Sequence, residues 1–154
     1  MIIRAYSDGE YIYSVNMMIK YVNNTKYKYK NISLDKLLHN LFVKGWGNSM
    51  NINKRFTPMN IIQDPKLSLL NSELIQKSEL IYPIIIYIYY KKLYIIDGYH
   101  RLSKAFLLKQ QNIKAYIFTD ELLHKFKIAD NNPKGWNFVE NLNDSIINEI
   151  YNAK

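Results

Sequence analysis

The strongest hydrophobic pattern in the chain is a pair of apolar runs joined by two lysines. The first run, Ile84–Tyr89, follows Pro83 and contains only β-branched and aromatic residues. It is too apolar to leave one face in water, so it predicts a central, buried strand. The second run, Leu93–Ile96, predicts a partner strand, with the hairpin turn at Lys91-Lys92. Because two lysines suit a two-residue turn poorly, we expect a longer loop there.

After the second run, the pattern changes from strand to helix. Asp97-Gly98 is a common turn dipeptide, and apolar residues then recur at helical spacing from Tyr99 or His100 to Leu108. Residues 93–108 therefore predict a strand, a tight turn and a helix, around which the rest of the chain is organised.

The flanking segments predict further short elements. Before the hairpin they are a turn at Asn23-Asn24, a half-buried strand at Lys26–Lys30, a helix at Ser33–Leu41 capped by Ser33, a helical turn at Met59–Ile62, and a helix at Leu67–Glu79 with Leu67, Leu70, Leu74 and Ile75 on one side. After it they are a strand at Ile113–Phe118 and a helix at Asp120–Phe126 capped by Thr119. The glycines in Gly45-Trp46-Gly47 predict a loop that holds one large ring, either over a pocket or in packing. Together they predict an α+β fold, in which a small mixed sheet with a strand hairpin is flanked by helices.

The last part of the chain predicts a linker and one helix. Asp130–Gly135 combines aspartate, asparagine, proline and glycine, which is typical of a linker. Residues 137–154 predict an amphipathic helix that starts with Asn137 and Glu140 in capping-box spacing. This helix packs on the domain or docks with a partner protein or a second copy. We therefore expect an extension over residues 1–55 packed on the core, a core over residues 56–128, and the helix over residues 137–154.

Composition narrows the functional classes. The chain has 154 residues, a net charge of +8 and no cysteine, which excludes disulfides, thiolate metal sites and a cysteine nucleophile. The longest apolar run, Leu80–Tyr90, is interrupted by Pro83 and is too short to span a bilayer, and the first residues do not form a secretory signal. We expect a soluble, cytoplasmic protein without membrane contact, whose positive charge favours nucleotides or nucleic acid as partners.

The alternation of lysine and tyrosine in Lys26–Lys30 fits two interpretations. A basic, aromatic strand is a surface on which nucleic-acid bases stack, so a nucleic-acid-binding protein, with or without nuclease activity, is the alternative function. An edge strand shows the same pattern when its lysines prevent pairing with other chains and its tyrosines cover the core.

The candidate chemistry lies at the start of the helix that follows Gly98. His100, Arg101 and Lys104 fall in its first turns, where backbone N–H groups already carry about half a positive charge. Each cation costs about 0.3–1 kcal/mol there. The cluster thus indicates an anion, and a phosphate group suits the backbone donors, the dipole and the guanidinium together. In the alternative, Asp97 or a more distant carboxylate neutralises Arg101 in an ordinary turn.

The order of these elements resembles the ParB/sulfiredoxin-like superfamily. The shared pattern is a proline-bounded short helix, a second helix, an apolar hairpin, the motif Gly98-Tyr99-His100-Arg101 between strand and helix, and a closing strand. The resemblance covers Phe56–Phe126, about half of the chain. It implies the fold of a superfamily that includes ParB-type nucleotide-binding domains, sulfiredoxins and free serine kinases.

The resemblance also implies site residues. In the superfamily, the glycine, histidine and arginine of the motif bind nucleotide phosphates, and a further basic residue often reaches them from before the proline-bounded helix. The resemblance implies this role for Gly98, His100 and Arg101, and for Lys54 and Arg55 before the proline-bounded helix. Tyr99 and Lys104 lie at the same turn and are further candidates for phosphate binding.

Departures from the family motifs narrow the activity. Sulfiredoxins have their catalytic cysteine where this chain has Tyr99, so sulfinic acid reductase activity is excluded. ParB-type domains have further arginines where this chain has Leu102 and Ser103, which argues against CTP-dependent clamp behaviour. Free serine kinases have an acidic residue before the glycine, as this chain has Asp97. That carboxylate would hold Mg²⁺ or take a substrate proton, or it only caps the turn.

The expected function is therefore nucleotide binding. The expected ligand is a nucleoside triphosphate, ATP or CTP, with Mg²⁺. Its γ-phosphoryl group would be hydrolysed or transferred to a small molecule, with Asp97 and His100 as the candidate catalytic residues.

Overall fold

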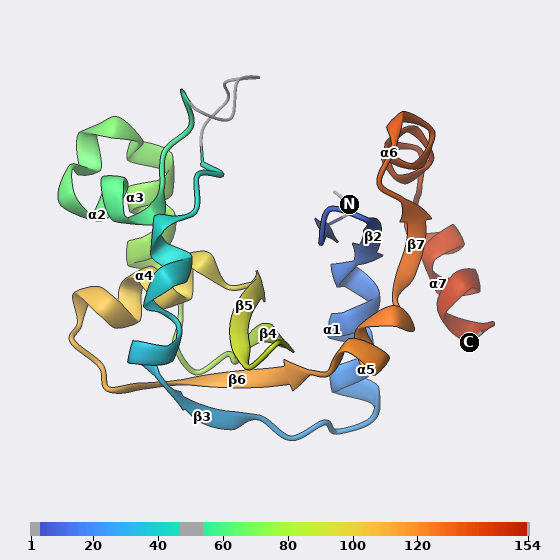
Figure 1. Ribbon diagram of the computed structural model, residues 1–154, viewed down its shortest axis with the longest axis horizontal. Coiled ribbons are helices and arrows are strands. Elements are labelled where there is room, and N and C mark those ends of the chain that lie inside the picture. Colours follow the sequence, from blue (N-terminus) through green and yellow to red (C-terminus); the bar gives the residue numbers. More distant parts are fainter. Residues whose placement is uncertain (1–3, 47–53, 154) are drawn as a thin grey trace. The chain divides into compact units, whose positions relative to one another are not determined.

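The computed structural model describes residues 4–46 and 54–153 (Figure 1). They form one sheet of three strands and one of four, with helices around them, so the predicted α+β class is confirmed. The chain divides into two compact units, which we call unit 1 (Met1–Lys28 and Phe118–Lys154) and unit 2 (Tyr29–Ile117). These boundaries differ from the expected ones at residues 55 and 128, because both end segments of the chain belong to unit 1.

Unit 1 is built on an antiparallel sheet in the order β1-β2-β7. Its strands are β1 (Ala5–Ser7), β2 (Tyr11–Ser14) and β7 (Lys127–Asp130), and its helices are α1 (Val15–Asn24), α5 (Asp120–His124), α6 (Pro133–Glu140) and α7 (Asp144–Asn152). Each helix starts after a polar side chain that accepts a hydrogen bond from the first turn. The predicted cap Thr119 is one of these.

Helix α1 is one of the elements that the sequence interpretation missed. It begins after the cap Ser14, and its buried residues Val15, Met18 and Val22 recur at helical spacing. The predicted turn at Asn23-Asn24 is wrong because the helix continues through it. The predicted strand at Lys26–Lys30 is also wrong, since the strand in this region starts only at its last residue.

The end of the chain contains two helices and no linker. Asn132 caps α6 by accepting a hydrogen bond from the Gly135 N–H at 2.7 Å. A Cβ atom on Gly135 would collide with the carbonyl oxygen of Asp130, so this glycine permits close packing of α6 on β7. The predicted start at Asn137 is wrong as well, because Asn143 caps a separate helix, α7.

Unit 2 contains a sheet in the order β3-β6-β4-β5, from β3 (Lys30–Ser33), β6 (Asn112–Phe118), β4 (Ile84–Tyr89) and β5 (Lys92–Asp97). This arrangement confirms the predicted hairpin, the central position of β4 and the third strand. The hairpin turn is shorter than expected. Tyr90 and Lys91 have φ angles of 49° and 64°, and Tyr89 pairs directly with Lys92. This is a two-residue turn with positive φ at both central positions.

The helices of unit 2 are short. They are the 3₁₀ helices η1 (Leu34–Lys36), η2 (Leu38–Phe42) and η4 (Pro65–Leu67), and the α-helices α2 (Pro58–Gln63), α3 (Leu69–Lys77) and α4 (Tyr99–Leu107). The single helix predicted at Ser33–Leu41 is thus two 3₁₀ helices, and Ser33 makes no side-chain cap. Of the predicted apolar stripe along α3, Ile75 is buried, whereas Leu70 is 67% exposed.

The core of unit 2 lies between the sheet and these helices. It contains Leu34, Leu37, Leu41, Ile84, Ile86, Leu93, Ile95, Leu102, Ala105, Ile113 and Ala115. Both predicted apolar runs thus contribute to one core. None of the helices in residues 4–46 and 54–153 has the length and apolarity needed to cross a membrane.

Candidate phosphate site at the start of helix α4

The tight turn before α4 depends on Gly98. This residue has φ 128°, which favours glycine, and a Cβ atom there would collide with the Ile84 side chain. Gly98 is therefore required for close packing of the turn on β4. It also leaves α4 without a side-chain N-cap, whereas α1, α2, α3, α5, α6 and α7 each have one.

Arg101 is held by three acceptors. One terminal nitrogen of its guanidinium donates to the carbonyl oxygens of Tyr82 at 3.2 Å and Pro83 at 2.9 Å. The other donates to Asp97 Oδ2 at 3.1 Å, in an ion pair whose side chains are both 17% exposed. The alternative interpretation of the sequence, in which Asp97 neutralises Arg101, therefore describes a contact that is present.

Lys104 lies against the end of α3. Its Nζ donates to the carbonyl oxygens of Gln76 at 2.9 Å and Ser78 at 2.6 Å. The last carbonyls of a helix carry partial negative charge, so they are suitable partners for an ammonium group. Lys104 also lies in the last turn of α4 and not at its start as expected, and a cation is favoured there. Neither Arg101 nor Lys104 thus needs an external anion to be accommodated on α4.

His100 is fixed on two sides. Its Nε2 lies 2.9 Å from Asn71 Oδ1, and its ring stacks on Trp46 with a centroid distance of 4.6 Å and an interplanar angle of 11°. The amide nitrogen of Asn71 donates to Ser68 Oγ at 3.1 Å, which turns the amide oxygen toward the imidazole. Nε2 is therefore the protonated nitrogen of the neutral ring, and Nδ1 is the unprotonated one.

The charge state of His100 is set mainly by burial. Burial lowers its pKa below the ordinary 6.5, the carboxylate of Asp97 raises the pKa, and the guanidinium of Arg101 lowers it again. The net shift is downward, so the imidazole is neutral at pH 7.

The segment before α2 reaches the same place through Trp46. The backbone of Trp46 pairs with that of Phe56, with N–H to carbonyl distances of 3.0 and 2.7 Å. Trp46 also stacks on His100, so this pairing places Phe56 near the start of α4. Lys54 and Arg55 directly precede Phe56 in the chain. The side chain of Lys54 is exposed and that of Arg55 is half-buried.

Tyr99 lies on the core side of the turn. Its half-buried side chain packs against the core of unit 2, and burial raises the pKa of its phenol. Its carbonyl oxygen accepts a hydrogen bond from Ser103 Oγ at 2.8 Å. The side chain of Tyr99 therefore serves packing.

The donor set does not suit a magnesium ion held by the protein alone. In the described ranges, no three histidine or acidic side chains lie together. Asp97, the predicted ligand, is already paired with a guanidinium. Mg²⁺ prefers oxygen ligands that no cation occupies.

Several contributors to this site could not be identified from sequence. Trp46 is an exception, because the glycines on both sides of it in the sequence predict a fixed ring. Asn71 and the carbonyl groups of residues 76, 78, 82 and 83 give no local signal, because any residue supplies a carbonyl and only the fold brings these to α4.

Comparisons with known proteins add no relative. No protein-family model matches the chain, and no curated protein or solved structure is significantly similar to it. The resemblance to the ParB/sulfiredoxin-like superfamily therefore stays a prediction that depends on the motif and the order of elements.

Proposed function

We propose that this protein binds a nucleoside triphosphate, ATP or CTP, with its phosphates at the start of α4. The observation that carries the proposal is that α4 begins at a glycine without a side-chain cap, while Arg101 is fixed in its first turn and Lys104 in its last turn. Helix N-terminal N–H groups and nearby fixed cations attract the same ligand, an oxyanion.

The two cations keep donors for such a ligand. A guanidinium has five N–H donors and an ammonium three. Within the part of the chain that the structure describes, Arg101 uses three of its N–H donors and Lys104 uses two of its N–H donors. Two donors of Arg101 and one of Lys104 are thus available to phosphate oxygens without breaking the existing contacts.

His100 couples phosphate binding to pH. In its neutral form, Nδ1 presents a lone pair, which repels a phosphate oxygen. Protonation converts Nδ1 into a donor. A bound phosphate therefore favours the protonated ring, and the affinity for phosphate should rise as the pH falls toward the lowered pKa of His100.

The test is calorimetric titration of the whole chain with ATP, CTP, ADP and inorganic phosphate. We expect triphosphates to bind most tightly. Arg101→Lys keeps the charge and loses the planar fork, and it should weaken triphosphate binding at least about tenfold. Lys66→Gln, an exposed lysine on η4, should leave affinity unchanged.

Two results would overturn the proposal. One is the absence of heat with every nucleotide for wild-type protein that is folded by circular dichroism. The other is equal triphosphate affinity in wild type and in folded Arg101→Lys and His100→Gln variants. Release of inorganic phosphate or ADP in the same samples tells whether binding leads to hydrolysis.

A further inference from the structure

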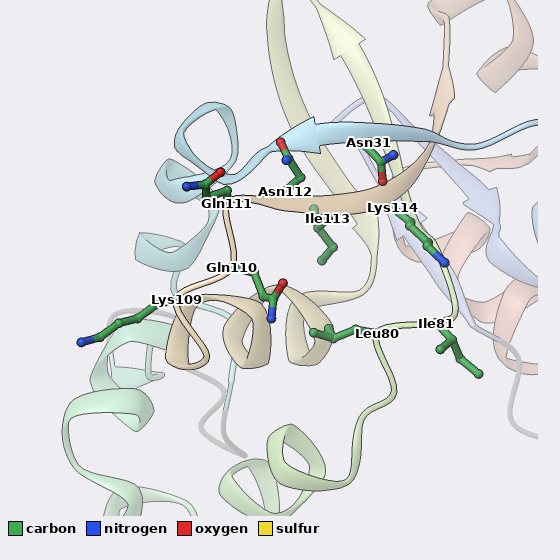
Figure 2. A pocket seen from close by; sticks show the side chains of 9 residues that line it. All are labelled: Asn31, Leu80, Ile81, Lys109, Gln110, Gln111, Asn112, Ile113 and Lys114. Atoms are coloured by element: carbon green, nitrogen blue, oxygen red, sulfur yellow. The ribbon is translucent and has the colours of Figure 1, made fainter.

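Unit 2 has a hollow of about 740 Å³ away from the residues of the α4 site. It is lined by Asn31, Leu80, Ile81, Lys109, Gln110, Gln111, Asn112, Ile113 and Lys114. Figure 2 shows that these side chains come from β3, from β6, from the connection after α4 and from the loop before β4. The volume lies within the roughly 300–1,000 Å³ typical of ligand sites.

Amide and lysine side chains make up most of the lining. Four of the lining side chains are amides, two are lysines and none is a carboxylate. Within the described residues, none of the four amide side chains makes a hydrogen bond, and neither lysine has an ion-pair partner. The amides are Asn31, Gln110, Gln111 and Asn112. Both donors and acceptors are therefore exposed beside positive charge.

The backbone that carries these side chains is fixed. Lys109 ends α4 in a left-handed conformation with φ 56°, and the N–H of Gln110 bonds the Ala105 carbonyl at 2.9 Å. In the antiparallel pair of β3 and β6, Asn31 lies directly opposite Lys114. Opposite residues of such a pair share one face of a sheet, so an amide and a lysine are presented together.

An aromatic ring lies next to this lining. Tyr29 directly precedes β3 and is 45% exposed, and Lys114 Nζ lies 5.2 Å from its ring centroid. Lys30, the first residue of β3, is exposed as well. The hollow thus adjoins an accessible ring that is combined with a cation.

We propose that this hollow binds single-stranded nucleic acid. The lysines suit backbone phosphates, the amides can donate to and accept from the edges of unpaired bases, and Tyr29 offers a face for base stacking. An acidic peptide would match the lysines and make less use of the four amides. This site shares no residue with the proposed nucleotide site at α4.

The test measures fluorescence anisotropy of labelled 12-nucleotide DNA and RNA strands with the whole chain at several salt concentrations. The double variant Lys109→Gln and Lys114→Gln should bind at least tenfold more weakly. The slope of log affinity against log salt should fall by about 1.4, since each phosphate contact contributes about 0.7 for single strands.

The chain offers a closely matched control. Lys91 also has a left-handed backbone, with φ 64°, and Lys92 Nζ also lies over a tyrosine ring, that of Tyr94, at 5.8 Å. The double variant Lys91→Gln and Lys92→Gln removes the same charge and should bind like wild type. Tyr29→Leu should weaken binding, whereas Tyr89→Leu, at a similarly exposed ring, should not.

The proposal is overturned if the strands do not bind, if both double variants lose affinity equally, or if poly-glutamate competes as well as unlabelled DNA. The nucleotide proposal is judged separately, by ATP titration of the same variants. If the protein binds ATP but not DNA, only the proposal for the hollow is rejected. If it binds DNA but not ATP, only the proposal for the α4 site is rejected.

Discussion

The side-chain amide of Asn40 pairs with the backbone of Ile95 as a neighbouring strand would. Its Oδ1 accepts from the Ile95 N–H at 3.1 Å, and its Nδ2 donates to the Leu93 carbonyl at 3.1 Å. Because β5 is an edge strand, no neighbouring strand of the sheet offers these groups a partner on this side. Asn40 is 1% exposed, so water does not replace it.

We therefore expect Asn40→Ala to destabilise unit 2. The variant leaves the buried N–H of Ile95 unpaired, at a cost of about 1–3 kcal/mol, and removes one donor from the Leu93 carbonyl. Urea unfolding followed by circular dichroism measures the change. Asn112→Ala, at an exposed amide, is the control and should change the free energy of unfolding by less than about 0.5 kcal/mol. Equal stability of the two variants would contradict this role of Asn40.

The turn before α4 makes a prediction for glycine substitutions. Gly98→Ala should cost about 2–5 kcal/mol, because it combines a strained positive φ with a collision against Ile84. Gly45→Ala should be close to neutral, because a Cβ there meets nothing within 4 Å. Thermal unfolding of both variants tests this. A Gly98→Ala protein as stable as wild type would show that the turn relaxes.

Burial of His100 predicts a pH dependence of stability. Its folded pKa is below the ordinary 6.5, so the unfolded chain binds the proton more readily. This contribution to stability is present above pH 6.5 and is lost as the pH falls toward the folded pKa.

Urea unfolding at pH 7.5, 6.5 and 5.5 should therefore show a steeper loss of stability for wild type than for His100→Gln. His39, whose pKa burial also lowers, is common to both proteins and cancels in the difference. Parallel curves for the two proteins would contradict the assignment.

In unit 1, the hydroxyl of Tyr13 donates to Asp8 Oδ2 at 2.7 Å. Burial raises the pKa of Tyr13, so the phenol remains protonated. Burial also raises the pKa of Asp8, but bonds from the Tyr11 N–H, the Tyr13 hydroxyl and the Glu10 N–H together lower it below 3.8.

Tyr13→Phe should therefore destabilise the protein by about 1–2 kcal/mol at pH 7. The loss should shrink as the pH falls through the lowered pKa of Asp8, because the carboxylate then becomes protonated. Tyr151→Phe is the control in the same unit. Thermal unfolding at pH 7 and at a pH below the lowered pKa of Asp8 measures both effects, and a loss that does not change with pH would exclude Asp8 as the partner.

The elements that could be predicted from sequence are those whose pattern is local. The β4–β5 hairpin and the start of α4 combine long apolar runs with the turn dipeptide Asp97-Gly98. Few other secondary structures fit that pattern. Helix α1 was missed because its buried positions Val15, Met18 and Val22 lie among tyrosines that also suit strands. The C-terminal helix was predicted as one because Asn137 resembles a cap, whereas Asn132 and Asn143 have that role.

For the candidate site, the local sequence identifies the cations Arg101 and Lys104 but does not identify the groups that they contact. The charge of Arg101 is balanced partly by Asp97, four residues earlier, and this alternative could be stated in advance. The acceptors of Lys104 belong to the end of α3, more than twenty residues away. Such contacts depend on how helices pack, which the spacing of residues within one helix does not specify.

The division of the chain has a consequence for synthesis on the ribosome. Unit 2 is one continuous stretch, so all strands of its sheet have been translated by residue 118. Unit 1 needs β7, which pairs with β2 across more than a hundred intervening residues. The N-terminal hairpin of β1 and β2 must therefore wait, incompletely paired, while the whole of unit 2 is made.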